Sequence, residues 1–275
     1  MAEPRGFTFG DNSVASAYDD VLVPALFQPW AVRLVEEHPQ WWEGRCVLDL
    51  ATGTGVVAQL LADQVGPEGR VIGTDINGEM LSIAKKRCAG STPAVSFIES
   101  PAHPLELSSD AVDVVVCQQG FQFFPDRRAA AGEMYRVLRK GGRVIASTWR
   151  PVTECELFGT ICRALRAIGE EEIADMMRVP FDFMPESELA SHFRSAGFAS
   201  VDVRRQEQDL VLGGGVRNAI ETAYSTPIGP RLQALPEEKQ VLFQNAMTEL
   251  LGELSDDGLT MGRMISNVLV AEKSA

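Results

Sequence analysis

Short apolar runs alternate with amphipathic stretches through the middle of the chain. The runs have the length of buried strands, and the run at 112–117 is almost entirely β-branched. Between the runs, apolar residues recur at intervals of three and four, which predicts helices packed on a sheet. Strands that alternate with helices indicate βαβ units and a mostly parallel sheet. The predicted strands of this central part lie at residues 46–50, 70–75, 95–98, 112–117 and 143–149.

The pattern changes on both sides of this central part. After a first helical interruption, a helix at 186–196 and a strand from Val201 continue the alternation, and a last strand at 264–270 follows a second helical interruption. We therefore expect an α/β fold with a Rossmann-like, doubly wound, mostly parallel seven-stranded sheet, and helical cap insertions after the fifth and sixth strands. The expected parts of this single domain of residues 1–275 are a helical segment at 1–45, a core at 46–150, and cap insertions at 151–184 and 213–262.

Composition excludes several classes of protein. The chain is 45% hydrophobic and 23% charged, which is typical of a globular protein with a large core. A net charge of −13 would repel a phosphate backbone, so nucleic acid is not an expected partner. No run approaches the roughly 18 apolar residues that a membrane span requires.

The five cysteines contain no Cys-x-x-Cys pair, and several lie in apolar runs. Reduced cysteines of this kind fit a cytoplasmic protein. No His, Cys or Asp cluster has the spacing of metal ligands, so no metal is expected.

A glycine-rich loop follows the first predicted strand. Gly53 and Gly55 allow a sharp turn into a helix, whose first N–H groups favour a polar or anionic ligand. The spacing Gly53-x-Gly55-x-x-Ala58 also occurs in dinucleotide-binding proteins. An NAD(P)-dependent oxidoreductase is therefore one alternative.

Two acidic residues favour a different cofactor. Asp49 lies four residues before Gly53, where a carboxylate would repel a pyrophosphate but attract an ammonium group. Asp75 ends the second strand, where its carboxylate can accept hydrogen bonds from both hydroxyls of a ribose. One carboxylate near an amine and another near a ribose suit an adenosine that carries an amino acid. We therefore expect S-adenosylmethionine.

Three segments, 47–55, 71–76 and 124–143, resemble the class I S-adenosylmethionine-dependent methyltransferases. The resemblance covers roughly residues 45–150 and is closest to the type 11 group, which includes the quinone-biosynthesis C-methyltransferases. It implies transfer of a methyl group to oxygen, nitrogen or carbon of a small molecule by in-line displacement. A regulatory protein that binds the cofactor without turnover is the second alternative.

The resemblance also implies which residues bind the cofactor. Where the family has Gly-Asp-Ala after the third strand, this chain has Ser100-Pro101-Ala102. Proline cannot accept a hydrogen bond from the adenine amino group, so this contact is lost or is supplied by another residue. The residues implied in holding the methionine part, the ribose and the adenine are Asp49, Ala51, Gly53, Gly55, Asp75, Ile76, Met80, Ala102 and Gln118.

The segment at 117–124 follows the fourth strand and combines three amides with three phenylalanines. Amides can orient a neutral polar group, and aromatic faces can hold a flat acceptor. We therefore expect a small, aromatic or apolar acceptor, and a homodimer is compatible with the sequence. The candidate catalytic residues are Gln119, Tyr18, which related enzymes carry on a helix over the cofactor, and His103 at the lip of the pocket.

Overall fold

The computed structural model describes residues 16, 18–182, 184–252 and 259–275. The chain divides into two compact units, and each unit is built from separate segments. The sheet unit comprises Phe27–Thr148, Met184–Gln206 and Ser266–Ala275, and the helical unit comprises the described residues of Met1–Leu26, Trp149–Phe183 and Glu207–Ile265.

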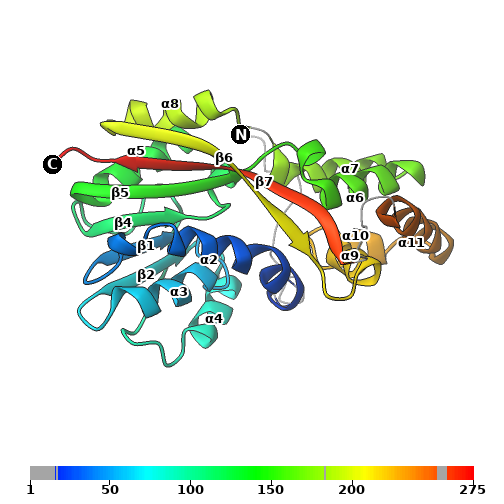
Figure 1. Ribbon diagram of the computed structural model, residues 1–275, viewed down its shortest axis with the longest axis horizontal. Coiled ribbons are helices and arrows are strands. Elements are labelled where there is room, and N and C mark those ends of the chain that lie inside the picture. Colours follow the sequence, from blue (N-terminus) through cyan, green and yellow to red (C-terminus); the bar gives the residue numbers. More distant parts are fainter. Residues whose placement is uncertain (1–15, 17, 183, 253–258) are drawn as a thin grey trace. The chain divides into compact units, whose positions relative to one another are not determined.

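A seven-stranded sheet has the order β3-β2-β1-β4-β5-β7-β6 (Figure 1). The pairs among β1 to β5 are parallel. β7 runs against β5, because the N–H of Lys273 donates to Gly142 while the N–H of Arg150 donates to Ile265. The expected α/β fold is therefore confirmed. The strands are β1 (Cys46–Leu50), β2 (Arg70–Asp75), β3 (Ser96–Glu99), β4 (Val112–Cys117), β5 (Leu138–Trp149), β6 (Ser200–Val211) and β7 (Thr260–Glu272).

The helices of the sheet unit form two layers (Figure 1). One layer contains α2 (Gln28–Glu36), α3 (Val56–Val65) and α4 (Gly78–Arg87), and the other contains α5 (Arg127–Val137) and α8 (Glu186–Ala196). Short 3-10 turns at Pro39–Trp41 and Phe121–Phe123 complete this unit.

Strand residues alternate between the two layers, as a period of two requires. Leu48 and Leu50 are buried in the same cluster as Met134 of α5 and Phe193 of α8. Asp49 lies between them in sequence and therefore faces the other layer.

Two polar side chains define where helices begin in the sheet unit. Asn77 accepts hydrogen bonds from the N–H groups of Glu79 and Met80 at the start of α4, at 2.9 and 3.3 Å. Asp126 accepts from the N–H of Ala129 at 2.8 Å and so caps the start of α5.

The strand expected from Arg143 begins earlier, at Leu138. Leu138 pairs with Val112 and Arg143 pairs with Val114, so the intervening residues form a bulge on β5. Gly141 has a φ of 71° within this bulge. Gly141 and Gly142, a pair of a kind that often ends a helix, therefore lie inside the strand region.

The helical unit is built mainly of helices that pack on one another. α6 (Glu156–Ala167) contacts α7 (Glu171–Arg178) and α11 (Glu237–Gly252), while α9 (Val216–Tyr224) contacts α10 (Gly229–Gln233) and α11. A π-helix (Tyr18–Phe27) and 3-10 turns at Val152–Glu154 and Val179–Phe181 complete the helical segments. No helix among the described residues is long and apolar enough to cross a membrane.

Candidate cofactor site

The loop between β1 and α3 turns tightly in the left-handed backbone region. Gly53 and Gly55 have φ values of 54° and 84°, and Ala51 reaches 59° although it carries a side chain. A Cβ on Gly55 would lie 2.9 Å from the Cβ of Ala84, so α3 and α4 approach closely only because Gly55 has none. A strained alanine beside two such glycines is typical of a functional turn.

Asp49 is buried at the start of this loop, with 1% of its surface exposed. The hydroxyl of Thr52 donates to its carboxylate at 2.5 Å. Burial raises the pKa of Asp49 to about 7, and the nearby Asp75 adds to the rise, while hydrogen bonds from Thr52 and Ala58 oppose it. A cation beside this group would favour its ionised form.

Asp75 fixes the end of β2 to the same loop. Its two carboxylate oxygens accept hydrogen bonds from the N–H groups of Gly53 and Asn77, both at 2.9 Å. Burial nevertheless raises its pKa above the usual value for aspartate. The N–H of Ile76 also hydrogen-bonds this carboxylate. A carboxylate has about four acceptor positions, so these three donors leave room for a ligand hydroxyl.

The residues after Asp75 provide an apolar surface. Ile76 is 72% exposed, which is unusual for an isoleucine at the end of a buried strand. Met80 is buried under the first turn of α4. A flat apolar ligand that covers Ile76 would remove this exposed surface from water.

The segment after β3 is held by a pair of charged residues that the sequence did not reveal as important. Glu133 accepts from the N–H of Leu105 at 2.6 Å and pairs with Arg136 at 2.7 Å. Arg136 donates to the carbonyls of Leu105 and Leu107 at 3.2 and 2.8 Å, and its hydrogen bond lowers the pKa of Glu133. Both residues lie in the segment that carries the family resemblance, but only the fold shows what they anchor.

Ala102 and His103 belong to this anchored segment. Ala102 is half-buried and His103 is exposed. Ser100 is buried, and its hydroxyl accepts from the N–H of Glu106 at 3.2 Å.

The amides after β4 have internal partners. Gln118 donates to the carbonyl of Phe27 at 3.0 Å, and Gln119 donates to the hydroxyl of Ser266 on β7, also at 3.0 Å. Gln119 has a φ of 54°. The side-chain oxygens of both amides are buried without a hydrogen-bond donor, and a buried acceptor without a donor is costly unless a ligand or water supplies one.

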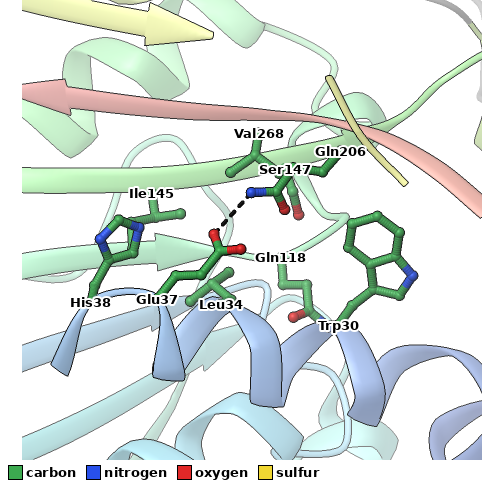
Figure 2. A pocket seen from close by; sticks show the side chains of 9 residues that line it. All are labelled: Trp30, Leu34, Glu37, His38, Gln118, Ile145, Ser147, Gln206 and Val268. Carbon is green, nitrogen blue, oxygen red and sulfur yellow. Dashed lines mark hydrogen bonds between the residues drawn. The ribbon is translucent and has the colours of Figure 1, made fainter. Parts of the chain in front are cut away.

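A narrow groove lies between α2 and the sheet next to Gln118 (Figure 2). Its volume of about 10 Å³ has room for one water molecule. At one end, Gln206 donates to the carboxylate of Glu37 at 2.9 Å. The lining residues are Trp30, Leu34, Glu37, His38, Gln118, Ile145, Ser147, Gln206 and Val268.

The structure thus brings Asp49, Asp75 and the glycine loop together at the carboxyl ends of β1 and β2. Tyr18 lies at the start of the π-helix of the helical unit, where it is half-buried. Within the described ranges, no group of three or more His, Cys, Asp or Glu side chains is arranged to hold a metal ion.

This site suits a nucleoside that carries an amino acid. The glycine loop leaves space for the ligand, the Asp75 carboxylate has a remaining acceptor position, and Ile76 presents an apolar face. A Rossmann-like sheet with such a site at its carboxyl edge is typical of enzymes that bind a cofactor containing a nucleoside.

Comparison with known proteins identifies the family. Residues 47–142 match the family described as "Methyltransferase domain". The ubiquinone/menaquinone biosynthesis C-methyltransferase UbiE of Xylella fastidiosa is 30% identical in an alignment of 231 residues that covers 78% of this chain and 87% of that protein. The same enzyme of Xanthomonas campestris is 31% identical in an alignment of 206 residues that covers 68% of this chain and 80% of that protein.

Two solved structures share the fold. Phosphoethanolamine N-methyltransferase 2 of Haemonchus contortus, in complex with phosphomonomethylethanolamine and S-adenosylhomocysteine, superposes with a TM-score of 0.64 at 15% identity, over 98% of this chain and 58% of that one. A putative methyltransferase of Bacillus halodurans has a TM-score of 0.57 at 18% identity, over 89% and 99% of the two chains.

The chain belongs to the class I S-adenosylmethionine-dependent methyltransferases. Its cofactor is S-adenosylmethionine and its activity is methyl transfer. The prediction made from the glycine loop and the two carboxylates is therefore confirmed for the cofactor. Membership in this family excludes the two alternatives left open by the sequence, an NAD(P)-dependent oxidoreductase and a regulatory protein that binds the cofactor without turnover.

Proposed function

We propose that this enzyme methylates a small aromatic or apolar acceptor that carries a hydrogen-bond donor, and that a ring carbon of a quinol is the first candidate. The observation that carries the proposal is the pair of buried amide oxygens of Gln118 and Gln119, which have no donor. A hydroxyl on the acceptor or the amine of the cofactor can supply one. The relatives at 30% identity are named as C-methyltransferases of quinone biosynthesis, which supports the same acceptor class.

The proposal assigns the cofactor to the carboxyl edge of the sheet. Asp49, Ala51, Gly53 and Gly55 would hold the methionine part, with the backbone carbonyl of Gln118 toward the amine. Asp75 would hold the ribose, and the adenine would contact Ile76, Met80 and Ala102. The geometry of the loop and the exposure of Ile76 support this assignment.

The proposed reaction is a displacement on carbon. The bound cofactor supplies an electrophilic methyl carbon. An electron pair of the acceptor forms the new bond to the methyl carbon, while the bond between that carbon and sulfur breaks and sulfur keeps its electron pair. The acceptor then loses a proton to solvent or to a base. The protein contributes by aligning the acceptor and excluding water, for which Gln119 and Tyr18 are the proposed residues and His103 a minor one.

We also propose a cytoplasmic location and a homodimer. Four of the five free cysteines are buried, and burial raises the pKa of Cys88 and Cys162 to about 11. Unpaired thiols of this kind fit a reducing compartment.

The proposed homodimer has a candidate contact surface. Exposed Val241 and Leu242 on α11 offer an apolar surface for a second copy. Light scattering on the purified protein would measure the mass, and a monomer at all concentrations would contradict the dimer.

The acceptor is tested with methyl-labelled S-adenosylmethionine. The purified enzyme is incubated with a reduced naphthoquinone, a simple phenol and phosphoethanolamine in parallel, and the labelled product is isolated from each. We expect label on a ring carbon of the naphthoquinol. Transfer to phosphoethanolamine alone would contradict the proposed acceptor, while leaving the methyltransferase assignment intact.

A further inference from the structure

Glu99, the last residue of β3, carries a carboxylate with no hydrogen bond or ion pair to the rest of the described chain. Glu99 pairs in register with Asp75 on the neighbouring parallel strand. Residues in register on adjacent strands point to the same face of a sheet. The two carboxylates therefore lie on the same face, one strand apart, at the carboxyl edge that holds the cofactor.

The position of the Glu99 carboxylate depends on Gly78. A Cβ on Gly78 would lie 2.8 Å from Oε2 of Glu99, which is closer than real contacts allow. Gly78 does not have the left-handed φ that would itself require glycine. The missing side chain thus makes room for the carboxylate at the first turn of α4, two residues beyond the exposed Ile76.

The placement of the cofactor proposed above puts its base near this carboxylate. Asp49 and the glycine loop, at β1, suit the methionine end, and Asp75, at β2, suits the ribose. The base is attached to the opposite side of the ribose from the methionine, so it extends from β2 toward β3. Adenine carries one exocyclic amino group, which needs an acceptor, and Pro101 in the following segment has no side-chain acceptor.

We propose that Glu99 accepts a hydrogen bond from the exocyclic amino group of adenine, and that it makes the enzyme selective for adenosyl ligands. Gly78 is then a positioning residue, because it leaves the space that the carboxylate occupies. The proposal rests on the proposed placement of the ribose at Asp75 and of the methionine end at Asp49, and not on the identity of the acceptor.

Binding of two ligands by calorimetry tests the proposal. S-adenosylhomocysteine carries the amino group, and its inosine analogue carries an oxygen at the same position. We expect the wild-type protein to prefer the adenosyl ligand by roughly 10- to 100-fold, as for a hydrogen bond to a charged acceptor. Glu99→Ala should weaken adenosyl binding by that factor and abolish the preference.

Three variants separate this role from other effects. Gly78→Ala should reduce the preference in the same direction, because its Cβ displaces the end of a flexible side chain. Glu79→Ala removes a neighbouring carboxylate on the exposed side of α4 and should leave the preference unchanged. Asp75→Ala should weaken both ligands by the same factor, since both contain the ribose.

A Glu99→Ala protein that still prefers the adenosyl ligand would overturn the proposal. A Glu99→Ala protein that stops discriminating against a 2′-deoxy ligand, while it keeps the adenine preference, would place the carboxylate on the ribose and would also overturn it. If the wild-type protein bound neither ligand, the cofactor assignment itself would fall, which is a distinguishable result.

Discussion

At the scale of single residues, Asp49 couples cofactor binding to pH. Its pKa of about 7, raised mainly by burial, means that the ligand-free site is partly protonated near neutrality. A cationic ligand favours the ionised form, so affinity for S-adenosylmethionine should rise with pH between about 6 and 7.5. Calorimetry across this range measures the slope. Asp49→Asn, which has no titrating group there, should bind more weakly and show a flatter profile, and an equal slope in both proteins would contradict the assignment.

The raised pKa of Asp49 also predicts how the stability of the ligand-free protein depends on pH. The folded pKa lies above the unfolded value of about 3.9, so the folded state holds a proton that the unfolded state has lost between about pH 4 and pH 7. The contribution of Asp49 to stability is thus present below pH 4 and is lost as pH rises through 7. Thermal unfolding of the wild type and Asp49→Asn should therefore show a difference that grows over this window.

The exposed imidazole of His103 should contribute little to turnover. His103→Ala is expected to lose less than about tenfold, whereas removal of a general base costs roughly 10²–10⁴-fold. Gln119→Met and Tyr18→Phe should lose more, because we propose that both residues orient the acceptor. Turnover is measured at saturating cofactor with an accepted substrate. A thousandfold loss in His103→Ala with normal cofactor binding would assign proton removal to that histidine.

The local part of the site could be predicted from the sequence, because strand ends and glycine spacing are local properties. Asp75 and the loop at Gly53 lie where the pattern places them. The hydrogen bond from Gln119 to Ser266 joins residues 147 positions apart, and no periodicity reports it. The apolar run that predicts the third strand stops at Ile98, one residue before the strand ends, so the sequence pattern does not include Glu99.

At the scale of elements, α5 anchors the segment that follows β3. Glu133→Ala removes the acceptor for the N–H of Leu105 and leaves Arg136 without its carboxylate partner. We expect a loss of about 1–3 kcal/mol in the free energy of unfolding, together with weaker cofactor binding. Denaturant unfolding measures the loss of stability, calorimetry measures cofactor binding, and faster amide exchange at Leu105 would report the lost hydrogen bond locally.

Glu188→Ala is the control for this prediction, since Glu188 is an exposed acidic residue in the first turn of α8, on the same layer of helices, and its carboxylate lies 4.0 Å from His192. It should change stability by less than Glu133→Ala. Equal losses would indicate a general effect of charge on these helices and not the anchoring of the segment.

Most strand positions followed from apolar runs, but the start of β5 did not. The pair Gly141-Gly142 is a common helix ending, and the sequence therefore favoured a break between helix and strand. In the structure, Leu138 pairs with Val112 before the bulge, because pairing with β4 satisfies backbone groups that the end of α5 leaves open. Pairing of β5 with β4 therefore outweighed the local preference of the two glycines for the end of a helix.

At the scale of the whole molecule, we expect that the segment that matches the family does not fold by itself. The core beside α5 also contains Phe193, Leu269 and Ala271, all of which lie beyond residue 150. Deleting one large core side chain costs about 3–5 kcal/mol, against a typical total stability of 5–15 kcal/mol. We expect a fragment of residues 1–150 to show no cooperative thermal transition by circular dichroism. A sharp transition would contradict this dependence on β6, β7 and α8.

The place of β7 between β5 and β6 has a consequence for synthesis of the protein. On the ribosome, β6 emerges about 50 residues before its neighbour, a delay of several seconds at usual rates of translation. Until β7 arrives, the nascent chain presents two open strand edges, and open edges invite pairing with other chains. We expect the unfinished chain to depend on chaperones, and slower translation between residues 211 and 260 to lower the yield of soluble enzyme.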